Sequence, residues 1–205
     1  GGRIDAEDVS LGESLGHELG AAIAAAVRET LEETAVPVAL DPLPSPDLAR
    51  ELQRDLLAGT PLEALLDAHR LTLDPAALTH FTRWLPPGDT PRRFDTWFFL
   101  AAAPPGDWHP NVGEEENRAA EWLSADDALE RDRAGTAALI FPTRSNLRRL
   151  APHRDFAAML ADAAAFPPVT ISPAIVDRNG QPCLAIPDGL GYPPTAEPIA
   201  GLRRG

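Results

Sequence analysis

The sequence predicts an α+β fold, and three stretches predict it. Residues 20–36 open with an alanine-rich run, which is a strong helix former. Leucines recur at every fourth position from Leu48 to Leu56, which places them on one face of a second helix. Residues 92–101 are rich in aromatic and aliphatic side chains and form the most strand-like run of the chain. Helices that cover a sheet are therefore expected.

The first half of the chain predicts a loop, a helix, a short strand and a helical insert. Residues 1–20 are polar and glycine-rich and predict a loop, and the helix over 20–36 is ended by Pro37, because proline cannot continue the hydrogen-bond ladder. Residues 36–40 predict a short strand. A helical insert is predicted over residues 45–79: its second helix begins at Pro61 with Thr60 as the N-cap, and a third, short one begins at Asp74-Pro75.

The second half alternates strands and helices. Strands are predicted over residues 78–85, 92–101 and 119–123, and helices after the capping residue Ser124 and over residues 143–150 and 155–165. Residues 107–117 form an acidic loop. Asn179-Gly180 lies between the apolar runs 169–176 and 183–186, which is the strongest short signal for a β-hairpin. Residues 187–205 predict an irregular arm.

Composition excludes several classes of function. The 205-residue chain has a formal net charge of −13, which disfavours non-specific binding to nucleic acid or to an anionic membrane. Its one cysteine, Cys183, excludes an internal disulfide and a multi-cysteine zinc site, and we expect it to act as a small apolar residue. No apolar run approaches the length of a membrane span and no signal peptide is recognised, so we expect a cytoplasmic protein.

The candidate chemistry lies at the end of the helix over residues 20–36. Glu29, Glu32 and Glu33 share one helix face, and Arg28 lies beside them. One interpretation is a solvated acidic face. The other is a site for a hard divalent cation, because carboxylate oxygens suit Mg²⁺ or Mn²⁺ and the cation removes their mutual repulsion.

This run resembles the second half of the Nudix box, GX5EX7REUXEEXGU, in which U is an aliphatic residue. Arg28-Glu29 and Glu32-Glu33 match its charged positions, and Val36 matches its closing aliphatic position. Ala35 stands where the family has glycine, and Thr30 stands where the family prefers an aliphatic residue.

The first half of the box is interrupted. Gly1-Gly2 would open it, but Gly20 stands where the family has its early glutamate, so an insertion is expected over residues 5–20. Glu13 or Glu18 could supply the missing carboxylate. In this fold strands precede the opening glycines, so the resemblance implies that the first strands lie outside this sequence.

A second resemblance narrows the first. Residues 90–99, the segment Trp84-Leu85-Pro86-Pro87 and the segment Phe141-Pro142-Thr143 resemble the branch of Nudix hydrolases that contains the peroxisomal-type coenzyme A diphosphatases. The resemblance implies an α/β/α sandwich with a mixed sheet, a helical insert that we interpret as an addition for substrate recognition, and an extended C-terminal arm. It implies a Nudix domain over residues 1–165, followed by a hairpin and arm over 166–205.

The resemblance also implies the chemistry. It implies a hydrolase that cleaves a diphosphate linkage, with coenzyme A or an acyl-coenzyme A as the leading substrate. Glu29, Glu32 and Glu33 would bind Mg²⁺ or Mn²⁺, with a backbone carbonyl near Gly2 as a further ligand, and Arg28 would hold a carboxylate through its planar fork.

The remaining site residues lie outside the box. In many family members a glutamate outside the box deprotonates the attacking water, and Glu116 is the candidate here, with Glu114 and Glu115 left open. Arg92 and Arg93 are candidates for phosphate contact, although alternation along a strand sends them to opposite faces; a salt bridge with Asp95 is the other interpretation. The histidines lack metal-ligand spacing, and Trp84 and Trp97 fit a core role better than base stacking.

Two alternatives stay open. One is a hydrolase of another nucleoside diphosphate derivative, such as ADP-ribose or a dinucleotide. The other is a Nudix-like binding module without turnover, which the displaced early glutamate and Ala35 favour and the intact charged set of the helix disfavours. The expected partner is a small nucleotide diphosphate, not nucleic acid or a membrane. The oligomeric state is left open, with a homodimer as one option.

Overall fold

The computed structural model describes residues 3–86, 95–112, 120–193 and 196–201 of the chain. They fall into two compact units. The first comprises residues 1–79 and 99–121, and the second comprises residues 80–98 and 122–205, within the described ranges. Strands β3 (Leu78–Trp84) and β4 (Thr96–Ala101) contribute residues to both units. The division into residues 1–165 and 166–205 stays a prediction.

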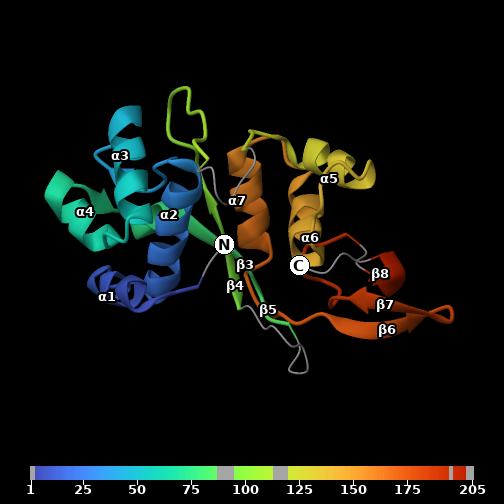
Figure 1. Cartoon of the computed structure of the whole chain (residues 1–205). Coiled ribbons are helices and arrows are strands. Elements are labelled where there is room, and N and C mark those ends of the chain that lie inside the picture. The colour runs from blue at the N-terminus through green and yellow to red at the C-terminus, as the bar shows by residue number, and fades with distance from the viewer. Residues whose placement is uncertain (1–2, 87–94, 113–119, 194–195, 202–205) are drawn as a thin grey trace. The chain divides into compact units, whose positions relative to one another are not determined.

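The first unit is built mainly from four helices. These are α1 (Ala6–Ser14), α2 (Gly20–Thr34), α3 (Pro46–Leu57) and α4 (Leu62–His69). Helix α2 packs against both α1 and α3, and α1 also contacts α4 (Figure 1). Two short strands, β1 (Leu40–Asp41) and β2 (Thr72–Leu73), pair antiparallel and are followed by the 3-10 helix η1 (Pro75–Ala77). The helices predicted for the insert are therefore confirmed. The strand predicted over residues 36–40 is wrong except at Leu40, where β1 begins.

Helix α1 corrects the prediction of a loop over residues 1–20. Its N-terminus is a capping box: the Asp5 carboxylate accepts hydrogen bonds from the N–H groups of Glu7 and Asp8, and the Asp8 carboxylate accepts one from the N–H of Asp5. The glycines of this stretch suggested a loop, but Gly12 lies inside the helix and is buried. Two predicted caps are also settled: Asp74 caps η1, whereas the N-cap of α4 is Pro61 rather than Thr60.

The apolar core of the first unit joins the box helix to the insert. Ile23, Val27 and Leu31 project from α2 and are almost fully buried. Leucines of α3 and α4 pack into the same cluster, together with Leu11 of α1 and Leu78 of β3. The insert thus supplies a large part of the core that holds α2, and its leucine periodicity is explained by this packing.

The second unit contains helices α5 (Ala125–Arg133), α6 (Phe141–Leu150) and α7 (Phe156–Ala165). Ser124 caps α5 as predicted, and Asp155 is the N-cap of α7, so the helix predicted over residues 155–165 begins one residue later. Strand β5 (Thr170–Ile171) pairs parallel with β3, with Ile171 opposite Trp84, in a sheet of order β4-β3-β5. Residues 120–123 are not a strand, so that part of the strand predicted over 119–123 is wrong.

The last described strands form a separate three-stranded sheet. Strands β6 (Ala174–Arg178) and β7 (Gln181–Ala185) form the predicted hairpin, and Asn179 and Gly180 both have positive φ, at 56° and 79° (Figure 1). Strand β8 (Ala196–Pro198) pairs antiparallel with β7 and is followed by η2 (Ile199–Gly201). The arm predicted as irregular is therefore ordered in this part, because it completes the sheet of the hairpin.

The core of the second unit is centred on Trp84, which packs with Phe141, Ile171 and Ile186. Asn146 of α6 accepts hydrogen bonds from the indole N–H of Trp84 and the hydroxyl of Tyr192. Trp84 and Cys183 are buried, which confirms their predicted core roles. The predicted α+β class is also confirmed. None of the helices in the described part of the chain has the length and apolarity that crossing a membrane requires.

Candidate active site

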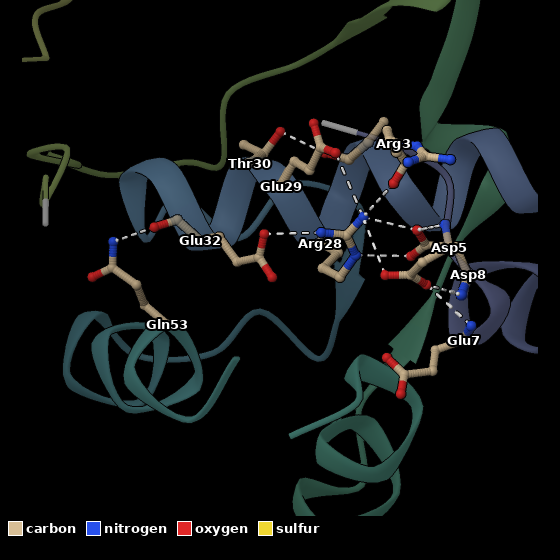
Figure 2. A network of polar contacts seen from close by, with 10 residues as sticks. Arg3, Asp5, Glu7, Asp8, Arg28, Glu29, Thr30, Glu32 and Gln53 are labelled. Atoms are coloured by element: carbon tan, nitrogen blue, oxygen red, sulfur yellow. Dashed lines mark hydrogen bonds and ion pairs between the residues drawn. The ribbon is translucent and has the colours of Figure 1, made fainter. Parts of the chain in front are cut away.

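Arg28 is the centre of an acidic network on helix α2. Its Nη1 donates to Oε2 of Glu32 at 2.9 Å, one turn further along the helix, and its Nη2 lies 3.5 Å from Oε1 of Glu29. From α1, Asp8 binds the guanidinium directly and Asp5 lies 3.8 Å from it. Figure 2 shows the guanidinium between these carboxylates. One positive charge therefore faces four negative ones.

Asp8 is the carboxylate that the sequence reasoning missed. Its side chain is only 2% exposed, and its two oxygens accept from Nε and Nη2 of Arg28 at 2.9 and 2.8 Å. Such paired bonds between a guanidinium and a carboxylate are strong and fix both groups. Glu13 and Glu18, the stand-ins considered from the sequence, are both exposed. One sequence signal could have found Asp8, because it follows Gly2 at the spacing that the family pattern gives between its glycine and its early glutamate.

Two glycines allow α1 to reach Arg28. A Cβ atom on Gly12 of α1 would lie 2.2 Å from the backbone nitrogen of Ala21, and a Cβ on Gly20 of α2 would lie 2.2 Å from the carbonyl oxygen of Gly12. No side chain tolerates such distances, so the two helix backbones touch at this crossing. The insertion between the acid and the arginine is thereby folded back so that the two residues meet.

The network shifts the pKa values of its members. The hydrogen bonds that Arg28 donates to Asp8 are the main reason that the pKa of Arg28 is raised well above its ordinary range. Burial raises the pKa of Glu32, and the nearby charge of Arg28 opposes that shift. The pKa of Asp5 is lowered, chiefly because its carboxylate accepts the N–H of Asp8. Arg28 is therefore always charged here, and the carboxyl group of Glu32 is harder to ionise than an ordinary glutamate.

The predicted metal ligands occupy the last turns of α2. Glu29, Glu32 and Glu33 all come from this helix and are half-buried, and the first two are near Arg28. Within residues 3–86, 95–112, 120–193 and 196–201, no three His, Cys, Asp or Glu side chains are grouped so that they could hold a metal ion. The carboxylates have suitable chemistry for a hard cation, but they do not converge on one point among these residues.

Comparison with known proteins identifies the fold. The chain is similar to the crystal structure of a NUDIX hydrolase from Alicyclobacillus acidocaldarius, with a TM-score of 0.64 and 27% sequence identity over 78% of each chain. This chain has the Nudix hydrolase fold. The same match supports assignment as a Nudix pyrophosphatase. No family model matches the sequence, and no curated protein does.

Helix α2 accommodates both residues that depart from the box, Ala35 and Thr30. Ala35 ends α2 in the left-handed region, with φ 55°, and its N–H donates to the carbonyl of Leu31. Glycine adopts this conformation without strain, which explains why the family pattern has glycine at this position. Thr30 replaces an aliphatic residue, and its hydroxyl donates to the carbonyl of Ala26 one turn back, so its polar atom is satisfied within the helix.

Several predicted site residues fall outside the described part of the chain. These are Gly2, Arg92, Arg93, Glu114, Glu115 and Glu116. Asp95, which was considered as a salt-bridge partner for that arginine pair, accepts two hydrogen bonds from Arg83 at 2.8 and 2.5 Å. The guanidinium of Arg83 also lies 4.3 Å from the centre of the Trp97 ring, so Trp97 is a structural partner of Arg83 in this unit.

Proposed function

We propose that this protein is a Mg²⁺- or Mn²⁺-dependent Nudix hydrolase that cleaves a diphosphate linkage, with coenzyme A or an acyl-coenzyme A as the leading substrate. The observation that carries the proposal is the paired bond between Asp8 and Arg28, in a chain similar to a solved Nudix hydrolase. This bond fixes the helix whose next two turns carry Glu29, Glu32 and Glu33.

The acidic end of α2 is the place for the cation. Glu29, Glu32 and Glu33 supply the carboxylate oxygens that hard divalent ions prefer, and one arginine leaves their negative charge in excess. A bound divalent cation would supply positive charge against the diphosphate oxygens and would acidify water. Asp8, with its oxygens engaged by Arg28, is assigned to orienting the helix rather than to binding the cation.

The other roles come from the resemblance. Glu116 is proposed to take the proton from the attacking water, with Glu114 and Glu115 as its rivals. Arg92 and Arg93 are proposed to contact the phosphates, where a planar guanidinium can bind two oxygens at once. Positioning and charge stabilisation would then supply most of the rate enhancement, as in other phosphoryl transfers.

The substrate is the finer part of the proposal. The resemblance of residues 90–99 and of Trp84-Leu85-Pro86-Pro87 to the coenzyme A diphosphatase branch favours coenzyme A. A panel with coenzyme A, acyl-coenzyme A, ADP-ribose and a dinucleotide, assayed for release of monophosphates, would rank them. Hydrolysis of ADP-ribose alone would keep the reaction and remove the substrate assignment.

The reaction is tested by replacing a proposed ligand. Glu33→Gln keeps the shape of the side chain and removes its charge, and should lower the hydrolysis rate in Mg²⁺ by about 10²–10⁴. Glu51→Gln is a matched control, because Glu51 is an exposed residue of α3, and it should leave the rate unchanged. A Glu33→Gln protein as active as the parent would refute the assignment of Glu33.

A further inference from the structure

The C-terminal end of α2 is held by side and main chains from elsewhere in its unit. The last carbonyl groups of a helix have no partner within the helix and need one outside it. The carbonyl of Glu32 accepts from Nε2 of Gln53 at 2.9 Å, and the carbonyl of Thr34 accepts from the N–H of Asn111 at 2.7 Å. Figure 2 shows Gln53 reaching the helix at Glu32. The turn that carries Glu32 and Glu33 is thus tied down at two points.

Gln53 uses its whole amide in this contact. Besides the bond to Glu32, its Nε2 donates to the carbonyl of Asn111 at 2.8 Å, and its Oε1 accepts from Nδ2 of Asn111 at 2.6 Å. The side chain is 2% exposed. Only a primary amide offers two donors and an acceptor in this arrangement, so neither a carboxylate nor an aliphatic side chain can replace it.

Gln53 is a polar residue on the buried face of α3. The helix buries Ala49, Leu52, Gln53 and Leu56, and Gln53 alone of these four is polar. A buried amide costs free energy unless it is fully hydrogen-bonded, whereas a leucine at the same place would add to the apolar core. Its three bonds join the insert, the end of α2 and the segment that leads towards Glu114–Glu116 in the sequence.

We propose that Gln53 is a positioning residue for the hydrolase: it fixes the last turn of α2, which carries the proposed cation ligands Glu32 and Glu33. This inference rests on the proposed function. It gives the helical insert a direct part in the chemistry, beyond the substrate recognition expected from the sequence. Gln53 acts through the backbone of Glu32, and Asn111 is its partner in that contact.

The test compares two substitutions that remove the donors. Gln53→Met fills the same space without hydrogen bonds, and Gln53→Glu keeps the shape but cannot donate. Each should lower kcat and weaken Mn²⁺ binding, measured by electron paramagnetic resonance, by roughly 10- to 100-fold, the usual effect of losing a group that orients a metal ligand. The KM for coenzyme A should change by less than about threefold, because the substrate itself is not contacted.

Leu52→Val is the matched control, because Leu52 is fully buried on the same helix and belongs to the apolar cluster. It should lower the melting temperature and leave kcat and Mn²⁺ affinity at parental values. Hydrogen exchange of the amides that follow Glu32 should accelerate in both Gln53 variants and not in Leu52→Val. Parental kcat and Mn²⁺ affinity in Gln53→Met would overturn the role of Gln53.

The two proposals fail in different ways. If the parent binds Mn²⁺ but hydrolyses no diphosphate, the proposed function fails, and the Mn²⁺ affinities of the variants still decide the role of Gln53. If the parent binds no Mn²⁺ and has no activity, both proposals are overturned. If the parent is active and Gln53→Met matches it in every readout, only the positioning role is lost.

Discussion

Gly12 and Gly20 touch backbone to backbone where α1 crosses α2. A Cβ atom on Gly12 would lie 2.2 Å from the backbone nitrogen of Ala21, and a Cβ atom on Gly20 would lie 2.2 Å from the carbonyl oxygen of Gly12. This contact places Asp8, one turn before Gly12, beside Arg28. Neither glycine has a positive φ that would demand glycine. Both are required because a side chain would push the helices apart.

Gly12→Ala should therefore destabilise the protein, although alanine is the better helix former. The overpacked crossing should cost at least about 1–3 kcal/mol of the free energy of unfolding, which outweighs the gain in helix propensity. Chemical denaturation measures this difference. Glu13→Ala, at an exposed neighbouring position of α1, should change it by no more than about 0.5 kcal/mol. Equal stability of the two variants would show that the crossing is not tight.

Arg28→Met should leave the buried carboxylate of Asp8 without its counter-charge. Breaking one half of a buried ion pair typically costs about 3–5 kcal/mol. Adding Asp8→Asn removes the stranded charge, so the double variant should recover about 1–3 kcal/mol relative to Arg28→Met. A double-mutant cycle by urea denaturation measures the coupling. Strict additivity of the two single effects would mean that the pair contributes nothing.

Ala35→Gly should stabilise the protein, although a substitution to glycine inside a helix usually destabilises it. The left-handed conformation of Ala35 costs about 1 kcal/mol, which glycine relieves. Ala26→Gly is the matched control inside α2, where the same change should cost about 1 kcal/mol. Thermal unfolding should therefore rank Ala35→Gly as the more stable by about 1–2 kcal/mol. The reverse ranking would contradict the left-handed cap.

His80 should make the stability of the protein sensitive to acid. Burial lowers the pKa of His80 below its ordinary value of 6.5, so the folded state favours the neutral ring. Its contribution to stability is fully present above pH 6.5 and is lost as the pH falls through the lowered pKa. The melting temperature should fall as the pH drops below 6.5, and His80→Gln should flatten that fall. His109→Gln, at an 80% exposed ring, should not.

Local signals predicted much of the fold. The cap at Ser124 and the Asn179-Gly180 turn act within a few residues, so their patterns are complete in the sequence. The leucine spacing of the insert and the acidic end of α2 are of the same kind. Such elements are defined by periodicity and by neighbours along the chain.

Non-local contacts account for the misses. Helix α1 was read as a loop because its glycines lower helix propensity, whereas their value lies in the contact with α2. Strand β8 has only three residues and forms through pairing with β7, and no local sequence pattern predicts that pairing. Asp8 was missed because its partner is distant in the chain and close only in space. The helix of the candidate site was predictable, whereas the carboxylate that anchors it was not.

The close glycine contact also affects how related proteins are found. A linear sequence pattern demands a fixed interval between the early acid and the arginine, whereas in this chain Asp8 and Arg28 form an ion pair across a longer interval. A better query would specify two helices joined by a short turn, a small residue on each at the closest approach, and complementary charges one turn away. Searches with such a three-dimensional template should find further chains in which the acid and the arginine meet in space although their spacing along the sequence differs.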